Sequence, residues 1–276
     1  MESIENKAFD EERALYGSRD VQVKSCRFEG PADGESAFKE CSDIAVENSF
    51  FDLRYPFWHD RHLKISDCEL TENCRAAIWY SDHIRIATTK LHGIKALREC
   101  SNVNMENCDV VSPEFGWSCS FVNMSDTNVT SEYFMMHAND LDFDNITLNG
   151  KYSFQYVDHG HFSNCTFTTK DAFWHACDIM LENCTLRGEY IGWYSDHVTL
   201  INCHIVGTQP FCYCKNLKLI DCTMEGCDLA FEKSEVEACI LSSVESVKNP
   251  LYGSIEAQHF GEIILDTPTA CEIHTL

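Results

Sequence analysis

A repeat of nineteen residues constrains this chain more than any other feature of its sequence. Each copy reads apolar-x-apolar-x-Asn-Cys-x-apolar, followed by a polar turn and an aromatic segment, and the two copies that begin at Ala176 and Ser195 show this plan clearly. We call the residue after the Asn or Asp the marker position; from Thr89 to Cys222 its spacing is nineteen at every step. The marker residues are Cys68, Thr89, Cys108, Thr127, Ile146, Cys165, Cys184, Cys203 and Cys222. Such a repeat identifies a stacked architecture, because one copy cannot bury its apolar face alone.

Within each copy the apolar residues alternate with polar ones, as Ile179 and Leu181 do, and this period of two indicates β-strands. The Asn or Asp before the marker, such as Asn183, tolerates left-handed backbone angles and suits a tight corner between strands. Stacked about 4.8 Å apart, these residues also form side-chain ladders. The pattern predicts an all-β fold, a single-stranded parallel β-helix of about twelve coils. A leucine-rich horseshoe has similar repeat lengths, but its leucine pattern is missing.

The repeat favours one domain over residues 1–276. Residues 1–20 precede the coils and are expected to form a short N-terminal cap, with a helical turn or more at FDEERALY that covers the first coil's edge. The coils are expected over residues 20–248, and residues 249–276 are expected to close the far end. The spacing fails at the loop GPADGESAFKE (30–40) and at an insertion around ENCRAA (72–77), so a lid or second site is an alternative there. Its candidate residues are Asp33, Glu35, Arg75, Lys95 and Arg98.

Charge and cysteine content limit the partners and the compartment. With 44 acidic and 21 basic residues, the net charge of −23 argues against nucleic-acid and membrane partners, which are bound through Lys and Arg. No apolar run approaches the roughly 20 residues of a membrane span. The first residues lack the apolar core of a signal peptide, so we expect a cytoplasmic protein. Seventeen cysteines, an odd number, then fit reduced thiols better than disulfides.

Two aromatic columns follow from the repeat. All five tryptophans share one position, nine residues after the marker where the spacing is regular, and either an interior stack or a platform for sugars fits them. The next position is a polar column, which we expect to face solvent because Glu99 and Glu232 occur in it. The polar column is His59, Tyr80, Glu99, Ser118, His137, Tyr156, His175, Tyr194, Tyr213 and Glu232. A third row, three residues further on, is His62, His83, Asn102, Asp140, His159, Asp178, His197 and Asn216. Stacked His and Tyr also stabilise a sheet surface, which is the alternative to a binding role.

A charged turn precedes each aromatic segment and supplies the candidate catalytic residues Asp171, Glu189, Glu132 and Asp228. Carboxylates one coil apart approach the roughly 5 Å of a retaining glycosidase pair, and those two coils apart approach the spacing of an inverting pair. A neighbouring lysine lowers a carboxyl pKa, which favours a base or nucleophile. The alternative is an ion ladder of Glu132, Lys151, Lys170 and Glu189. The candidate ligand-binding residues are His137, Tyr156, His175, Tyr194, Tyr213, Trp174, Trp193, Lys151 and Lys170.

No cofactor and no metal site is predicted from the sequence. The cysteine-dense stretch from Cys203 to Cys227 lacks the paired spacing of a zinc ribbon. Asp140, Asp142 and Asp144 share a strand face, and their oxygens suit calcium, but this is the weaker alternative. There is also no Gly-rich phosphate loop, nucleophile elbow or dinucleotide fingerprint.

Eight segments carry a family resemblance: DGESAFKE (33–40), LRYPFWH (53–59), CRAAIWYS (74–81), HGIKALRE (92–99), SPEFGW (112–117), GKYSFQY (150–156), TKDAFWH (169–175) and GTQPFCYC (207–214). With them the chain resembles a bacterial family of unknown function within the pectin-lyase-like superfamily. The resemblance implies a right-handed parallel β-helix but no catalytic residues. Superfamily motifs of polygalacturonases and pectate lyases, Asn-Thr-Asp with a downstream Asp-Asp and Arg-x-Lys, are absent, and His159-Gly160-His161 alone is a weak match.

Two functions remain open at this stage. The aromatic and acidic columns, together with the resemblance, favour a protein that binds or processes a carbohydrate, with an oligosaccharide or glycoside as partner. The evenness of the columns favours a non-catalytic scaffold that binds a protein partner or itself, because an active site usually interrupts a repeat. Whether the protein is an enzyme is left open.

Overall fold

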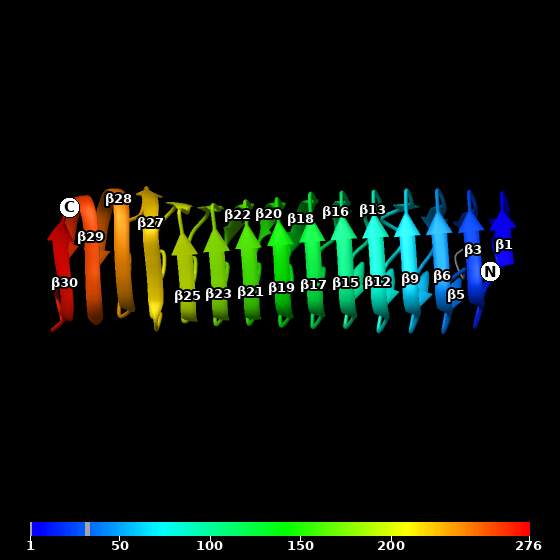
Figure 1. Ribbon diagram of the computed structural model, residues 1–276, viewed down its shortest axis with the longest axis horizontal. Coiled ribbons are helices and arrows are strands. Elements are labelled where there is room, and N and C mark those ends of the chain that lie inside the picture. Colours follow the sequence, from blue (N-terminus) through cyan, green and yellow to red (C-terminus); the bar gives the residue numbers. More distant parts are fainter. Residues whose placement is uncertain (1, 31–33) are drawn as a thin grey trace. The chain divides into compact units, whose positions relative to one another are not determined.

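The computed structural model describes residues 2–30 and 34–276. The chain folds as a right-handed parallel β-helix and divides into two units, unit 1 (Met1–Asp142) and unit 2 (Phe143–Leu276) (Figure 1). Strands of successive coils pair in parallel, as β12 (Asp82–Ala87) does with β15 (Ser101–Glu106) in unit 1 and β23 (Cys177–Glu182) does with β25 (Asp196–Ile201) in unit 2. The predicted fold class is confirmed.

Unit 1 has three sets of stacked strands. The first sheet contains β1 (Glu2–Glu5), β3 (Arg19–Lys24), β6 (Ser42–Glu47), β9 (Arg61–Ser66), β12, β15 and β17 (Ser120–Ser125). The second contains β2 (Ala8–Phe9), β4 (Arg27–Glu29), β7 (Phe50–Asp52), β10 (Glu69–Leu70), β13 (Lys90–Leu91), β16 (Asp109–Val111) and β18 (Asn128–Glu132). The third contains β5 (Phe38–Lys39), β8 (Phe57–Trp58), β11 (Ile78–Trp79) and β14 (Leu97–Arg98).

Unit 2 has two sets of stacked strands, and the residues of β19 (Asn139–Asp144) fall on both sides of the division at Asp142. Its first sheet contains β21 (Asp158–Ser163), β23 and β25, and its second contains β20 (Thr147–Lys151), β22 (Thr166–Lys170), β24 (Thr185–Arg187) and β26 (His204–Val206). Three longer strands follow, β27 (Leu217–Glu225), β28 (Glu235–Lys248) and β29 (Tyr252–Ile264), and the six-residue β30 (Ala270–Thr275) ends the unit.

Because apolar and polar residues alternate along each strand, every second side chain lies in the core. Ile179 and Leu181 of β23 are buried, and their register partners in β25 are Val198 and Leu200. Met180, between the two buried residues, is exposed. Phenylalanines also lie in the interior of unit 2, where Phe154, Phe162, Phe167 and Phe173 are packed against one another. Each coil therefore buries its apolar residues within itself and against the coils beside it.

Left-handed residues form the corners of each coil. The predicted corner before the marker is confirmed, since Asn164, Asn183 and Asn202 have φ of 56°, 55° and 51°. The polar column is also left-handed, as Tyr194 shows with φ of 59°, and so is the third row, as Asp178 shows with φ of 53°. These two corners were not predicted, and they aim both rows of side chains outward.

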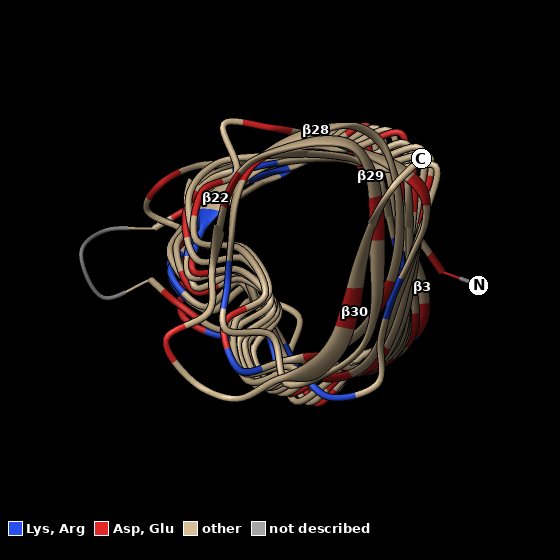
Figure 2. Ribbon diagram, turned by 90° about the vertical axis from the view of Figure 1, so that its left-hand side faces the viewer, with Lys and Arg blue, Asp and Glu red and all other residues tan. Residues whose placement is uncertain are grey.

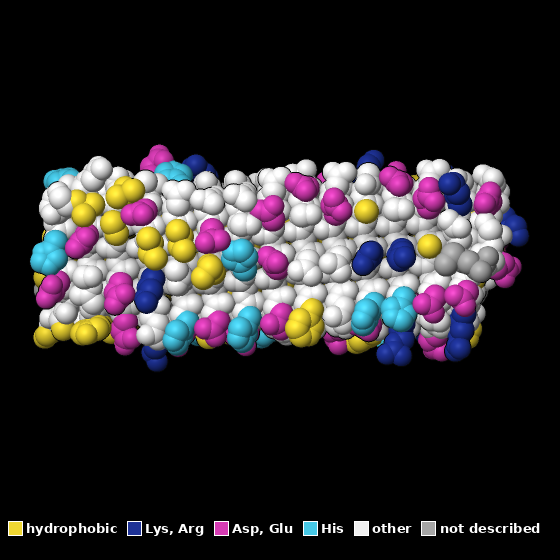
Figure 3. Space-filling model, in the orientation of Figure 1, with side chains coloured by type: hydrophobic (Ala, Val, Ile, Leu, Met, Phe, Trp, Pro, Cys, Tyr) yellow, Lys and Arg dark blue, Asp and Glu magenta, His cyan; other side chains and the backbone are white. Residues whose placement is uncertain are grey.

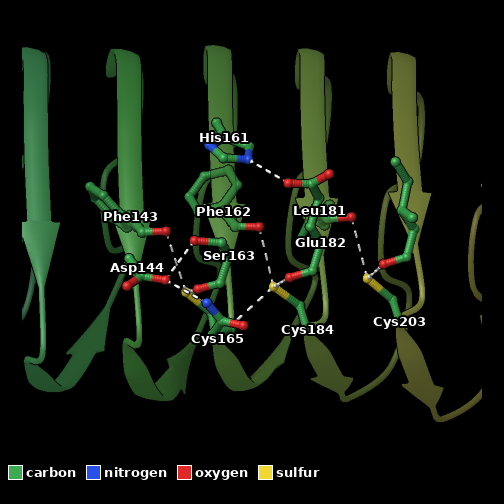
Figure 4. Close-up of polar contacts among 12 residues, drawn as sticks. Phe143, Asp144, His161, Phe162, Ser163, Cys165, Leu181, Glu182, Cys184 and Cys203 are labelled. Carbon is green, nitrogen blue, oxygen red and sulfur yellow. Dashed lines mark hydrogen bonds and ion pairs between the residues drawn. The ribbon is translucent and has the colours of Figure 1, made fainter.

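The marker position is a ladder of thiols and hydroxyls (Figure 4). In unit 2 the Cys165 backbone N–H donates to Cys184 Sγ at 3.4 Å, and the Cys184 thiol donates to the Phe162 carbonyl at 3.4 Å. In unit 1 the Cys68 N–H likewise donates to Thr89 Oγ1 at 3.3 Å. Cys, Ser and Thr share this position because each accepts a bond from the preceding coil and donates one to a backbone carbonyl of that coil or of its own, as Thr89 does to Ala87 at 2.8 Å. All seventeen cysteines are free thiols.

The N-terminal segment differs from the prediction. The helical turn expected at FDEERALY is not formed; residues 11–17 make bends and turns, and no helix occurs in residues 2–30 or 34–276. Instead, β1 pairs with β3 and β2 pairs with β4, because the buried Ile4 continues the alternation that meets Val23. The tail also continues the stack, with β29 paired to β30. The β-helix therefore has about 14 turns, where the sequence predicted about twelve.

Acidic residues outnumber basic residues in this protein. The view along the coils in Figure 2 shows Asp and Glu outnumbering Lys and Arg around it, as the composition requires. In the described part of the chain we find no helix of the length and apolarity needed to cross a membrane.

Candidate functional site

The aromatic corner, which we define as Tyr156, His175, Tyr194 and Tyr213, is a continuous stack of rings in unit 2. Successive ring centroids are 5.2, 5.1 and 4.7 Å apart, and the rings are inclined by only 7° to 11° to one another. Tyr156 and Tyr194 are 43% and 45% exposed, which confirms that the polar column faces solvent. The side chains point outward because the corner is left-handed, a cause that the prediction from Glu99 and Glu232 did not include.

Trp174 and Trp193 lie one residue before this corner and are half-buried. Their rings stack at 5.7 Å with an inclination of 4°. Each indole N–H donates to a backbone carbonyl of the next coil, Trp174 to Tyr190 at 3.0 Å and Trp193 to Gln209 at 2.8 Å. The tryptophans are thus neither an interior stack nor an open platform, since their polar edge is tied to the neighbouring coil.

An acidic turn lies next to the corner along the chain. Lys170, the last residue of β22, places its Nζ 3.7 Å from Asp171 Oδ2 and 3.9 Å from Glu189 Oε2. The structure therefore brings Asp171, Glu189 and Lys170 together around one ammonium group. Asp171 is buried, and Glu189 is exposed.

The pKa of Asp171 has the opposite shift from the one predicted. Burial raises this pKa and outweighs Lys170, which lowers it, while the charge of Glu189 raises it further. The prediction considered the lysine alone, because the sequence does not show that the carboxyl is buried. A raised pKa favours the protonated form of a carboxyl, which is the form that a general acid requires.

The other predicted residues are placed elsewhere. Lys151 is in register with Lys170, so the charges of the predicted ion ladder do not alternate at that step. Within unit 2 the sign of the charge changes only between Lys170 and Glu189. Asp228 lies further along, where its carbonyl accepts from the Gln209 N–H at 2.9 Å. Glu132 and His137 are exposed residues of unit 1.

Three of the five residues considered for a second site in unit 1 form ion pairs with other side chains. Glu35 pairs with Arg54 at 3.4 Å. Lys95 and Arg98 both approach Glu114, at 3.3 and 3.8 Å. Arg75 is exposed, and Asp33 lies outside the described residues.

The third row contains a cluster that the sequence analysis did not treat as a site. At the start of β21, β23 and β25, ligand atoms of Cys177, Asp178 and His197 lie within 4.8 Å of one another, and so do those of Asp158, His159 and Asp178. An open hollow of about 530 Å³ adjoins them. The dipeptide Asp-His occurs at 82–83, 158–159 and 196–197, so it marks a position of the repeat, and Cys177 as the strand partner of Asp158 and Asp196 is what distinguishes this cluster.

The metal alternatives drawn from the sequence have other partners. Asp144 accepts hydrogen bonds from Ser163 Oγ at 2.6 Å and Asn164 Nδ2 at 2.7 Å (Figure 4). Cys212 and Cys214 are buried, and their thiols donate to backbone carbonyls. Burial raises the pKa of Cys214 to about 11, so this thiol is inert near neutral pH.

Comparison with known proteins identifies the family. A family model described as "Protein of unknown function (DUF3737)" matches residues 2–275. No curated protein matches the sequence. Among solved structures, the A-module of a mannuronan C-5 epimerase from Azotobacter vinelandii matches with 10% identity over 98% of this chain and 88% of that one, with a TM-score of 0.35. A surface adhesin of Streptococcus pneumoniae matches with 6% identity over 94% and 84%, with a TM-score of 0.41. A mannuronic-acid-specific polysaccharide lyase from human gut microbiota matches with 7% identity over 96% and 77%, with a TM-score of 0.36. Because the family model spans nearly the whole sequence, the chain belongs to the DUF3737 family, whose function is unknown.

Proposed function

We propose that this protein binds an oligosaccharide or glycoside along the aromatic corner of unit 2. The observation that carries the proposal is the uninterrupted stack of rings from Tyr156 to Tyr213, in which Tyr213 is half-buried and the other three are exposed; neighbouring ring centroids lie 4.7 to 5.2 Å apart. Three phenol hydroxyls and one imidazole are set along it at this interval. Each of these groups both donates and accepts hydrogen bonds, as the hydroxyl groups of a sugar do.

The stack also determines how a sugar would bind. Because the rings lie nearly parallel and cover one another's faces, their edges and polar atoms are what remains for a ligand. Binding then rests on hydrogen bonds at an open surface and not on burial in a cavity. Enclosed sites bury most of a small ligand, so an extended chain that touches several coils fits this surface better.

The acidic turn supports a processing role for the same surface. Asp171 is a buried carboxyl with a raised pKa, and Glu189 is an exposed carboxylate on the other side of Lys170. Glycoside hydrolysis uses two carboxyl groups, one of which delivers a proton. In this proposal Asp171 is the acid and Glu189 is the base or nucleophile. Asp171→Asn would then abolish turnover of a bound glycan while leaving its binding within about threefold.

The binding proposal is tested with a panel of oligosaccharides and glycosides in thermal-shift and calorimetric titrations. A ligand at a hundred times its Kd adds about 2.7 kcal/mol to the stability of the folded protein. We expect at least one glycan to raise the melting temperature, and Tyr194→Ala to weaken its binding about tenfold. Tyr252→Ala is the matched control, because Tyr252 is a 66% exposed tyrosine of the same unit outside the corner.

The covered ring faces also favour a second function, a scaffold in which the stack stabilises the coils. The two functions predict different results in the thermal-shift experiment. If no glycan shifts the melting temperature and Tyr194→Ala lowers it without a ligand, the corner is structural and the carbohydrate proposal is wrong. Equal loss of glycan affinity in Tyr194→Ala and Tyr252→Ala would also contradict it.

A further inference from the structure

We propose that unit 2 binds one divalent metal ion of the zinc class through Cys177, Asp178 and His197, at the start of β23 and β25. The proposal is independent of the glycan surface, because none of the three residues belongs to the aromatic corner. Figure 3 shows His and acidic side chains alternating along the edge of the first sheet where β21, β23 and β25 begin.

The register of the sheet brings the ligands together. Asp158, Cys177 and Asp196 are partners in neighbouring strands. The next residue of each strand is left-handed: His159, Asp178 and His197 have φ of 57°, 53° and 52°. These three side chains therefore point outward in one row, with the half-buried Cys177 beside it.

The distances are those of a metal site that needs little rearrangement. Cys177 Sγ is 3.4 Å from Asp178 Oδ2, and the ligand atoms of Cys177, Asp178 and His197 all lie within 4.8 Å of one another. Zinc bonds of about 2.0 to 2.3 Å in a tetrahedron place ligand atoms about 3.3 to 3.8 Å apart. Asp178 and His197 are exposed, so their side chains are able to turn through the remaining distance.

A carboxylate already orients the imidazole. His197 Nδ1 is 2.9 Å from Asp196 Oδ1, and the same oxygen accepts from Asn216 Nδ2 at 2.9 Å. With a proton on Nδ1, the lone pair of Nε2 is free for a metal, which is how metal-binding histidines are commonly held. His159 repeats the arrangement, with Nδ1 3.2 Å from Asp158 Oδ1 and Nε2 3.8 Å from Asp178 Oδ2. A second imidazole thus lies within reach of the ligating carboxylate.

The chemical types of the three ligand atoms indicate which metal ion the site would bind. Sulfur, nitrogen and oxygen together suit zinc, whereas calcium and magnesium take oxygen ligands. Binding would replace the Cys177 thiol proton, which passes to solvent. Three protein ligands leave the fourth tetrahedral position to water or to a ligand from the adjoining hollow, whose lining includes Thr199, Asn216 and Lys218.

The chain contains a matched control. The pentapeptide WYSDH occurs at 79–83 and at 193–197. In the first copy His83 Nδ1 is also held by its neighbour Asp82, at 2.6 Å. The strand partners of Asp82, however, are Arg61 and Ser101, where the second copy has Cys177 on one side. His83 therefore has the oriented imidazole without the thiol.

The experiment is a titration of the reduced, chelator-treated full chain with Zn²⁺ by calorimetry and with Co²⁺ by absorption spectroscopy. We expect one equivalent to bind, with a cobalt–thiolate charge-transfer band. Cys177→Ser should remove the band, and His197→Ala should weaken binding at least tenfold. His83→Ala should leave both unchanged.

The remaining thiols require their own control, because Cys239 and Cys271 are also half-buried. Cys271→Ser should keep the band and the stoichiometry. A band that persists in Cys177→Ser, equal weakening in His197→Ala and His83→Ala, or no saturable binding would each overturn the proposal. Tyr194→Ala should bind zinc like the unaltered protein, so that failure of this site and failure of the glycan surface are separate results.

Discussion

At the scale of single residues, a buried carboxyl sets a pH dependence. Asp60 is 1% exposed; its Oδ1 accepts from the Cys41 N–H at 2.8 Å, and its Oδ2 has no partner among the described residues. Burial raises the pKa of Asp60 from 3.8 to about 8. In the folded state this group therefore keeps its proton between about pH 4 and pH 8, where the unfolded chain has lost it. Stability should fall as the pH rises through this window.

We predict that Asp60→Asn removes this part of the pH dependence. One titrating group changes the free energy of unfolding by at most about 1.4 kcal/mol per pH unit. Chemical denaturation between pH 4 and pH 8 measures the slope, and Asn keeps the shape of the side chain without the titrating proton. Asp67→Asn is the control, because Asp67 is exposed at a corner where other coils carry Asn. The same slope in Asp60→Asn as in the unaltered protein would show that the carboxyl does not titrate in this range.

The burial of Asp60 was not predicted from the repeat. Its position follows the polar column, and most other copies carry Cys, Ser or Ala there, such as Cys41, Ser81 and Ala176. A single acid in a column of small residues was a detectable signal, but only once that column was known to face inward. The direction of the Asp171 pKa was missed for the same reason, since burial and not the sequence neighbour decides it.

At the scale of elements, the marker ladder joins a corner to the coil before it. Cys184 accepts from the Cys165 N–H and donates to the Phe162 carbonyl. We predict that Cys184→Ala lowers the free energy of unfolding by about 1 to 3 kcal/mol, because it leaves a buried N–H without a partner.

Cys184→Ser should cost less than Cys184→Ala. Ser49 already occupies an equivalent position, where its Oγ accepts from the Cys26 N–H at 3.1 Å and donates to the Glu47 carbonyl at 2.9 Å. Urea unfolding of the two variants gives the comparison. If serine proves as costly as alanine, the thiol acts through its volume and the hydrogen bonds do not matter.

The strands and the first corner were predictable because each has a local cause. Alternation fixes the strands, and Asn is one of the few residues that accepts a left-handed backbone readily. The corner at the polar column uses residues such as Tyr194, which rarely adopt that conformation, so its sequence does not show it. The third row consists of His, Asp and Asn, which adopt it more often, and these residue types were a signal for a corner that the prediction did not use. The clustering of Cys177, Asp178 and His197 depends on one of these corners and was missed with it.

At the scale of the whole molecule, regularity explains both the success and the limit of the sequence analysis. Seven equal spacings of nineteen residues from Thr89 to Cys222 determine a stacked fold. The two ends of the chain lack the repeat motif, yet their strands β1 and β30 also pair with the strand of the neighbouring coil. Regular columns do not identify a site, however, because duplication copies residues whether or not they act. The two copies of WYSDH illustrate the point, because a cysteine is the strand partner of Asp196 in the second copy, whereas Arg61 and Ser101 are the partners of Asp82 in the first.

The whole molecule also carries a charge that should oppose its own folding. With 44 acidic and 21 basic residues, like charges outnumber the pairs that compensate them. Such pairs as Lys24 with Glu47 at 3.2 Å and Lys218 with Glu237 at 3.8 Å are solvent-exposed, and exposed ion pairs contribute little. Net self-repulsion therefore outweighs surface pairing. Salt screens this repulsion, with a Debye length of about 10 Å at 0.1 M and about 3 Å at 1 M.

We therefore predict that NaCl between 0.05 and about 0.5 M stabilises the protein by about 1 kcal/mol, a rise of about 2 to 4 °C in the melting temperature for a chain of this size. Calorimetry at fixed pH measures it, in chelator-treated buffer so that metal binding does not contribute. Glu237→Gln and Glu2→Gln, which each remove one exposed negative charge, should reduce the salt response slightly, whereas Lys218→Gln should increase it. If salt lowers the melting temperature instead, attraction between the paired surface charges exceeds the repulsion, and the acidic surface is stabilised by its ion pairs.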